Sequence, residues 1–132
     1  MKIRKPLADK NDMNVTPSQL DVVSKLMDGA AERQRVLSSN VANVNTPGYR
    51  RQGVSFEAEL GALLEKNDTQ AIQSVQVQVA ETMGLPERQD GNNVDIDMEM
   101  GMLSKNSLLF QTYAQILSTK IGMMRSAISG NS

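Results

Sequence analysis

The feature that most constrains this chain is a repeat of apolar pairs in its C-terminal third. The pairs recur every seven residues, and further apolar residues fall between them. A seven-residue period is typical of a helix that packs lengthwise against others, and a stripe this wide suits more than one partner. We therefore expect a long helix over residues 94–132. Its repeat consists of Met102-Leu103, Leu109-Phe110, Ile116-Leu117 and Met123-Met124, with Tyr113 between the second and third pairs.

A second heptad pattern lies near the N-terminus and predicts a helix over residues 16–45. Thr16 can cap the helix, Pro17 suits its first turn, and Thr46-Pro47-Gly48 cannot continue it. Gly29 weakens this helix by about 1 kcal/mol relative to Ala. The expected packing seam consists of Leu20, Val23, Met27, Leu37 and Val41.

The rest of the chain lacks a long periodic pattern. Residues 1–15 form a basic extension, and residues 46–93 form a variable middle segment. Within the middle, Phe56 and Leu60 indicate a short helix between residues 54 and 66, and Asn67-Asp68-Thr69 breaks it. Polar and apolar residues alternate over 73–79, which favours a short strand. The expected fold is mainly α, with two long heptad helices packing as a coiled-coil or helical tube element around an irregular middle.

Composition disfavours an enzyme. The chain has no His and no Cys among its 132 residues, which removes the commonest general base and the commonest zinc ligands. Asp90, Asp95, Asp97 and Glu99 do not follow the spacing of a calcium loop, so we interpret them as charges favoured at a helix start. No cofactor, metal or small-molecule substrate is expected.

Charge argues against nucleic acid as a partner. The formal net charge is −1, and the aromatic residues are not interleaved with the basic ones. We therefore interpret Arg33, Arg35, Arg50 and Arg51 as a solvated face. The basic opening of the chain is not followed by the apolar run of a signal peptide, so we do not expect the general secretory route.

Two sequence blocks resemble the flagellar rod, hook and hook-associated axial proteins. The first ends the N-terminal heptad helix and has the form Asn-x-x-Asn-x-x-Thr-Pro-Gly-Tyr. The second, residues 90–100, leads into the C-terminal heptad helix and is most similar to the proximal rod proteins. The signature residues of the first block are Asn40, Asn43, Thr46, Pro47, Gly48 and Tyr49.

The resemblance implies a structural subunit of the bacterial flagellar basal-body rod. Such subunits assemble helically, line the export channel, transmit torque, and leave the cell through the flagellar type III apparatus without a cleaved signal peptide. The implied partners are further copies, other rod proteins, the basal-body adaptor and membrane ring, and the export gate. The alternatives are another rod subunit, a small helical type III secretion chaperone or adaptor, and, third, a helical nucleic-acid binder.

Two hypotheses compete for the role of Phe56 and Leu60. Four residues apart on a short helix, they can anchor the middle segment to the subunit's own helices. They also resemble the Phe-x-x-x-hydrophobic motif by which early flagellar export substrates are recognised at the export gate. Both hypotheses stay open at the level of sequence.

Overall fold

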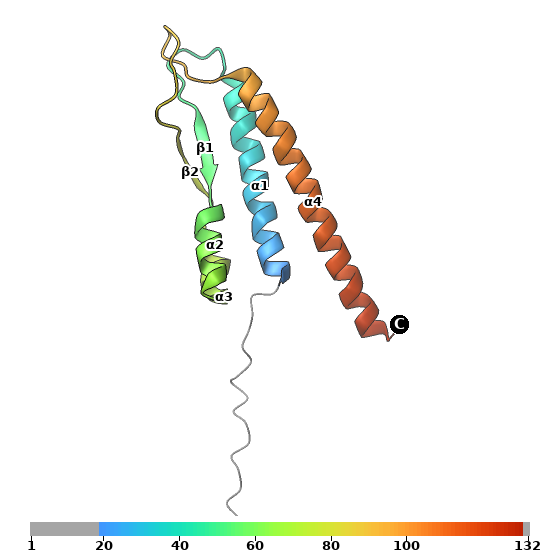
Figure 1. The fold of residues 1–132 in the computed structure, drawn as a ribbon. Helices are drawn as coiled ribbons and strands as arrows, with labels where there is room; N and C mark the ends of the chain where they lie inside the picture. Colours follow the sequence, from blue (N-terminus) through green and yellow to red (C-terminus); the bar gives the residue numbers. More distant parts are fainter. Residues whose placement is uncertain (1–18, 131–132) are drawn as a thin grey trace, which may run out of the picture.

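The computed structural model describes residues 19–130, and the fold is mainly α, as expected. The long helix α1 lies between the long helix α4 and the elements of the middle segment (Figure 1). The elements are α1 Gln19–Ala42, β1 Gln52–Ser55, α2 Glu57–Glu65, α3 Thr69–Ser74, β2 Gln78–Glu81 and α4 Ile96–Ser129.

Helices α1 and α4 run side by side in opposite directions (Figure 1). At 1.5 Å per residue, the 24 residues of α1 span about 36 Å and the 34 residues of α4 about 51 Å. Helix α1 ends at Ala42, three residues before the expected Asn45. The expected cap at Thr16 and Pro17 and the basic extension over 1–15 lie outside the described residues.

The ends of α4 follow local capping rules. The Asp95 carboxylate accepts hydrogen bonds from the backbone N–H groups of Asp97 (3.0 Å) and Met98 (3.2 Å). At the other end, Gly130 adopts a left-handed conformation with φ 67°, which glycine reaches without strain. None of the helices within residues 19–130 is both long and apolar enough to cross a bilayer.

The middle segment forms its own small apolar core against α1. Phe56, Leu60, Ile72 and Val75 are buried together there. The short helix was expected, and α2 confirms it, but α3 was not. Asn67-Asp68-Thr69 does break α2, yet Asp68 also begins α3 by accepting a hydrogen bond from the N–H of Ala71 (3.0 Å).

The expected short strand exists, but it lies further along the chain than 73–79. Strand β2 pairs antiparallel with β1, with Gln52 opposite Glu81 and Ser55 opposite Gln78. Residues 73 and 74 belong to α3, and Val75 is drawn into the apolar core instead of into the sheet. Tertiary packing therefore overrides the first half of the alternating pattern.

Candidate assembly site

The turn after α1 contains the second half of the Asn-x-x-Asn-x-x-Thr-Pro-Gly-Tyr signature. Asn43 Nδ2 donates to the carbonyl of Ser39 (2.8 Å), and its Oδ1 accepts from Thr46 Oγ1 (3.1 Å). Pro47 follows on the exposed surface, and Gly48 has φ 73°, which favours glycine. The side chains of Asn43 and Thr46 thus satisfy each other and a helix-end carbonyl, which stops α1 at this point.

Asn40 joins α1 to β1 and α4. Its side chain is fully buried, and its Oδ1 accepts from the N–H of Gln52 (3.0 Å) and from the hydroxyl of Tyr49 (3.0 Å). Its Nδ2 donates to the carbonyl of Gln52 (2.8 Å) and to Glu99 Oε2 (3.0 Å). The carboxamide pairs with both backbone groups of Gln52, as a neighbouring strand would.

Asn92 ties the second sequence block to the first. This fully buried residue donates from Nδ2 to the carbonyls of Asn43 and Thr46, both at 2.9 Å. Beside it, the N–H of Gly48 donates to the carbonyl of Asp90 (2.8 Å). The two blocks recognised in the sequence therefore meet at the end of the helix pair where α1 stops and α4 begins.

A buried ion pair between Arg51 and Glu99 lies at the same end, and it corrects two expectations. Arg51 was assigned to a solvated face and Glu99 to helix-start electrostatics, but their side chains are 8% and 0% exposed. Arg51 Nη1 also donates to Thr82 Oγ1 (2.8 Å), and its backbone N–H donates to Asn93 Oδ1 (2.6 Å). Because each charge has a hydrogen-bonded partner, the pair is tolerated in the interior.

The other three arginines that were assigned to a solvated face also form ion pairs. Arg50 pairs with Glu87 (2.5 Å) and Glu81 (3.0 Å), and these hydrogen bonds, that to Glu87 first, raise the pKa of the guanidinium. Arg35 pairs with Glu32 (2.5 Å), and the hydrogen bond from Arg35 lowers the pKa of that carboxyl. Arg33 pairs with Glu57, so none of the four is a free cation directed at a phosphate.

Sequence reasoning missed Asn92, Asn93, Arg51 and the role of Glu99. A signal for Glu99 was present, since Glu99, Asn106 and Tyr113 are spaced by seven residues. They share the register of the apolar seam, where a polar residue needs a buried partner.

The expected seam residues divide into a covered and an uncovered group. Val23 and Leu37 are buried, and Leu20, Met27, Val41, Leu109, Tyr113 and Leu117 are half-buried. Phe110, Ile116, Met123 and Met124 remain exposed. Of the large apolar side chains exposed within residues 19–130, ten belong to α4: Ile96, Met100, Met102, Leu108, Phe110, Ile116, Ile121, Met123, Met124 and Ile128.

Phe56 and Leu60 are anchored inside the folded subunit. The Phe56 ring lies directly on Gly29, where an added Cβ would be 2.0 Å from the ring, and Arg33 covers the ring at 5.4 Å from its centroid. The glycine that weakens α1 is therefore needed for this close approach.

Among residues 19–130, no group of three or more His, Cys, Asp or Glu side chains could hold a metal ion.

Comparisons with known proteins give one answer. Residues 27–50 match the family model described as flagella basal body rod protein. The chain is 32% identical over 120 residues to the flagellar basal body rod protein FlgB of Escherichia coli strain K12, covering 76% of this chain and 86% of that protein. It is 29% identical to FlgB of Borrelia hermsii over 122 residues, covering 79% of this chain and 90% of the relative. FlgB of Bacillus subtilis strain 168 is also 29% identical, over 111 residues that cover 74% of this chain and 83% of that protein.

Proposed function

Because the chain belongs to the FlgB family of flagellar basal body rod proteins, and is a structural subunit of that rod, we propose how its surfaces build the rod. Copies pack helically through the exposed apolar face of α4, enclose the export channel and transmit torque along the rod. The protein assembles with other flagellar basal-body proteins, and we extend this to further copies, the adaptor and membrane ring, and the export gate. It acts in the flagellar basal body, within the periplasmic rod, after type III export.

The observation that carries this proposal is the apolar surface of α4. Met123 is 60% exposed and Ile128 is 85% exposed, although both belong to a helix with a regular heptad repeat. So many exposed apolar side chains on one helix are unfavourable in water and indicate a contact with another protein. Many such contacts, repeated by one helical operation, produce an open filament instead of a closed oligomer.

The segments have different roles under this proposal. Residues 16–45 and 94–132 supply the rod helices, and residues 46–93 supply a variable segment that contacts neighbours. The signature Asn40, Asn43, Thr46, Pro47, Gly48 and Tyr49 holds these parts at a fixed angle, so that all copies present the same α4 face. The hydrogen bonds from Asn40 to Gln52 and Glu99 support this role.

The test places a charge on the α4 face. Ile116 borders an apolar hollow that Val22, Val23 and Leu64 also line, so Ile116→Asp brings an unpaired carboxylate into apolar surroundings. We expect Ile116→Asp and Met123→Asp each to abolish motility and rod assembly while the protein is still made and exported. Gln115→Asp, which adds the same charge at a polar position, is the control and should leave cells motile.

Motile cells carrying Met123→Asp, with rods as numerous as in the Gln115→Asp control, would contradict the proposal. A stable, folded dimer of the pure chain at low concentration, bound to another export substrate, would instead favour the chaperone or adaptor alternative.

Phe56 and Leu60 also serve export under this proposal. Both side chains are buried in the folded subunit, so docking to the export gate takes place before folding. In cells that cannot build a rod, the Phe56→Ala, Leu60→Ala double variant should leave the cytoplasm in smaller amounts, and Leu63→Ala is the control. Normal export of the double variant would end the gate hypothesis and leave anchoring as the role of the pair.

A further inference from the structure

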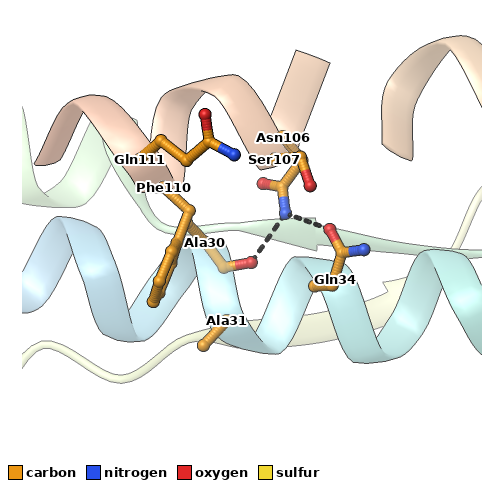
Figure 2. Close-up of a pocket in the computed structure, with 7 residues that line it drawn as sticks. All are labelled: Ala30, Ala31, Gln34, Asn106, Ser107, Phe110 and Gln111. Atoms are coloured by element: carbon orange, nitrogen blue, oxygen red, sulfur yellow. Dashed lines mark hydrogen bonds between the residues drawn. The ribbon is translucent and has the colours of Figure 1, made fainter. Parts of the chain in front are cut away.

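A pocket of about 350 Å³ lies between α1 and α4 next to Asn106 (Figure 2). Ala30, Ala31 and Phe110 supply apolar walls. The remaining lining residues are polar and uncharged: Gln34, Asn106, Ser107 and Gln111. The pocket therefore suits a long side chain that has an apolar stem and a polar end.

Asn106 leaves one acceptor unused inside this pocket. The residue is 2% exposed, and its Nδ2 donates to the carbonyl of Ala30 (2.8 Å) and to Gln34 Oε1 (2.9 Å). Since a carbonyl can only accept, the Ala30 contact fixes which end of the carboxamide is nitrogen. The oxygen, on the side of Asn106 that faces Phe110 and Gln111 in Figure 2, has no partner in the described structure. A buried acceptor without a donor is energetically unfavourable, so a hydrogen-bond donor from another molecule would stabilise this site.

Arg125 is a hydrogen-bond donor that has no carboxylate partner within residues 19–130. Within residues 19–130, Arg33, Arg35, Arg50, Arg51 and Arg88 each lie within salt-bridge distance of a carboxylate, and Arg125 does not. Arg125 is exposed near the C-terminal end of α4.

The pocket and Arg125 lie on the same side of the α1–α4 pair. Arg125 follows Gln111 by two heptads, and residues seven apart share one helix face. It borders another hollow along the same helices, lined on α1 by Met27, which precedes Gln34 by seven residues.

The end of α4 extends past the first described residue of α1 (Figure 1). Every residue from 121 to 129 is exposed, including the apolar Ile121, Met123, Met124 and Ile128. This apolar end lacks a cover among residues 19–130, so it is free to lie over another subunit.

We propose that the C-terminal end of α4 from a second copy docks over this pocket, with its Arg125 donating a hydrogen bond to Asn106 Oδ1. The inference rests on the proposed rod assembly. In one subunit the two groups are 19 residues apart on one helix, about 28 Å, so they cannot meet within a chain. The arginine stem packs between Ala30, Ala31 and Phe110, and side-chain rotation at the exposed Phe110 and Gln111 opens the path to the oxygen. The contact is head-to-tail and does not close on itself, as a filament requires.

The absence of Cys from the sequence allows a clean cross-linking test. Ser107→Cys and Arg125→Cys are made as separate single variants, co-produced in one strain, and oxidised in purified basal bodies. We expect a two-chain disulfide band from the mixture and none from either variant alone. A disulfide needs Cα atoms within about 7 Å, so the band reports contact between neighbouring copies.

Two results would overturn the inference. One is a mixture that forms basal bodies without the band, or with a band no stronger than either variant gives alone. The other is cross-linking of Arg125→Cys to Leu7→Cys within one chain, which would mean that the N-terminal segment covers the α4 end. In the first case rods still form, so the rod function stands and only this contact is removed.

If the cysteines prevent assembly, alanine substitution provides the second measurement. Arg125→Ala should reduce the number of rods at least tenfold without changing the circular dichroism of the dilute subunit. Lys105→Ala, which removes an exposed cation from the same helix, is the matched control and should give normal rod numbers. Equal rod numbers for the two variants would overturn the inference.

Discussion

The two ends of the α1–α4 pair are built on opposite principles. Where α1 ends and α4 begins, buried polar groups of Asn40, Asn92, Arg51 and Glu99 find their partners within the same chain. Along the last turns of α4, apolar side chains such as Met123 and Ile128 have no cover in the described structure. The first end fixes the shape of one subunit, and the second leaves the apolar surface that we propose is covered in the rod.

The chemistry of each end suits its task. A buried polar group requires one donor or acceptor in one place, so it specifies geometry. An apolar surface accepts any neighbour of matching shape, and Met side chains adapt to it most easily. Met123 and Met124 are both exposed at the open end of α4.

The largest expected effect separates the two ends directly. Glu99→Ala leaves Arg51 buried and unpaired, and we expect it to lower the free energy of unfolding by about 3–5 kcal/mol. Met124→Ala, at the open end, should change it by less than about 0.5 kcal/mol. Urea denaturation of the dilute subunit measures both. Similar losses for the two variants would mean that the ends do not differ.

A smaller effect tests the packing of the middle segment on α1. Gly29→Ala places a Cβ against the buried Phe56 ring, and overpacking of this kind costs about 1–3 kcal/mol, partly offset by about 1 kcal/mol of helix propensity. We expect a net loss of stability of about 1 kcal/mol. Gly101→Ala meets nothing within 4 Å on α4 and should instead stabilise the subunit by up to about 1 kcal/mol. Equal signs for the two substitutions in thermal denaturation would contradict the close approach.

The smallest expected effect depends on pH. Burial is the largest single influence on Glu57 and raises its pKa. The hydrogen bond from Arg33, the backbone hydrogen bonds and the charge of Arg33 together outweigh burial and leave the carboxyl pKa below its ordinary value of 4.5. A lowered folded-state pKa stabilises the subunit above about pH 4.5, and this contribution is lost as the pH falls through the folded-state value. Because Glu57 is half exposed, we expect only a few tenths of a kcal/mol.

Glu57→Gln should remove this part of the pH dependence in urea titrations between about pH 6 and pH 3, and Arg33→Met should remove it as well. A pH dependence that survives in Arg33→Met would mean that the ion pair is not its source.

Local features of the fold could be predicted from sequence. The heptad repeats identified both long helices, and Asp95 and Gly130 cap α4 through contacts with adjacent residues. The signature marked the correct turn, but the partners of Asn40 lie up to 59 positions away, so its hydrogen bonds could not be deduced.

The misassigned residues share one cause. Arg51 and Glu99 are 48 positions apart, and each has an ordinary solvent-exposed interpretation until the two blocks are brought together. Helix α3 was missed because the alternation over 73–79 suggested a strand, whereas burial of Ile72 and Val75 against Phe56 and Leu60 favours a helix followed by a coil.

Hydrogen exchange of the dilute subunit tests the central claim most directly. If one end is closed within the chain and the other is completed by assembly, amides of residues 36–42 and 99–106 should be strongly protected. Amides of residues 116–129 should exchange quickly in the subunit and become protected in purified basal bodies. Strong, uniform protection of α4 up to Ser129 in the dilute subunit would contradict the account.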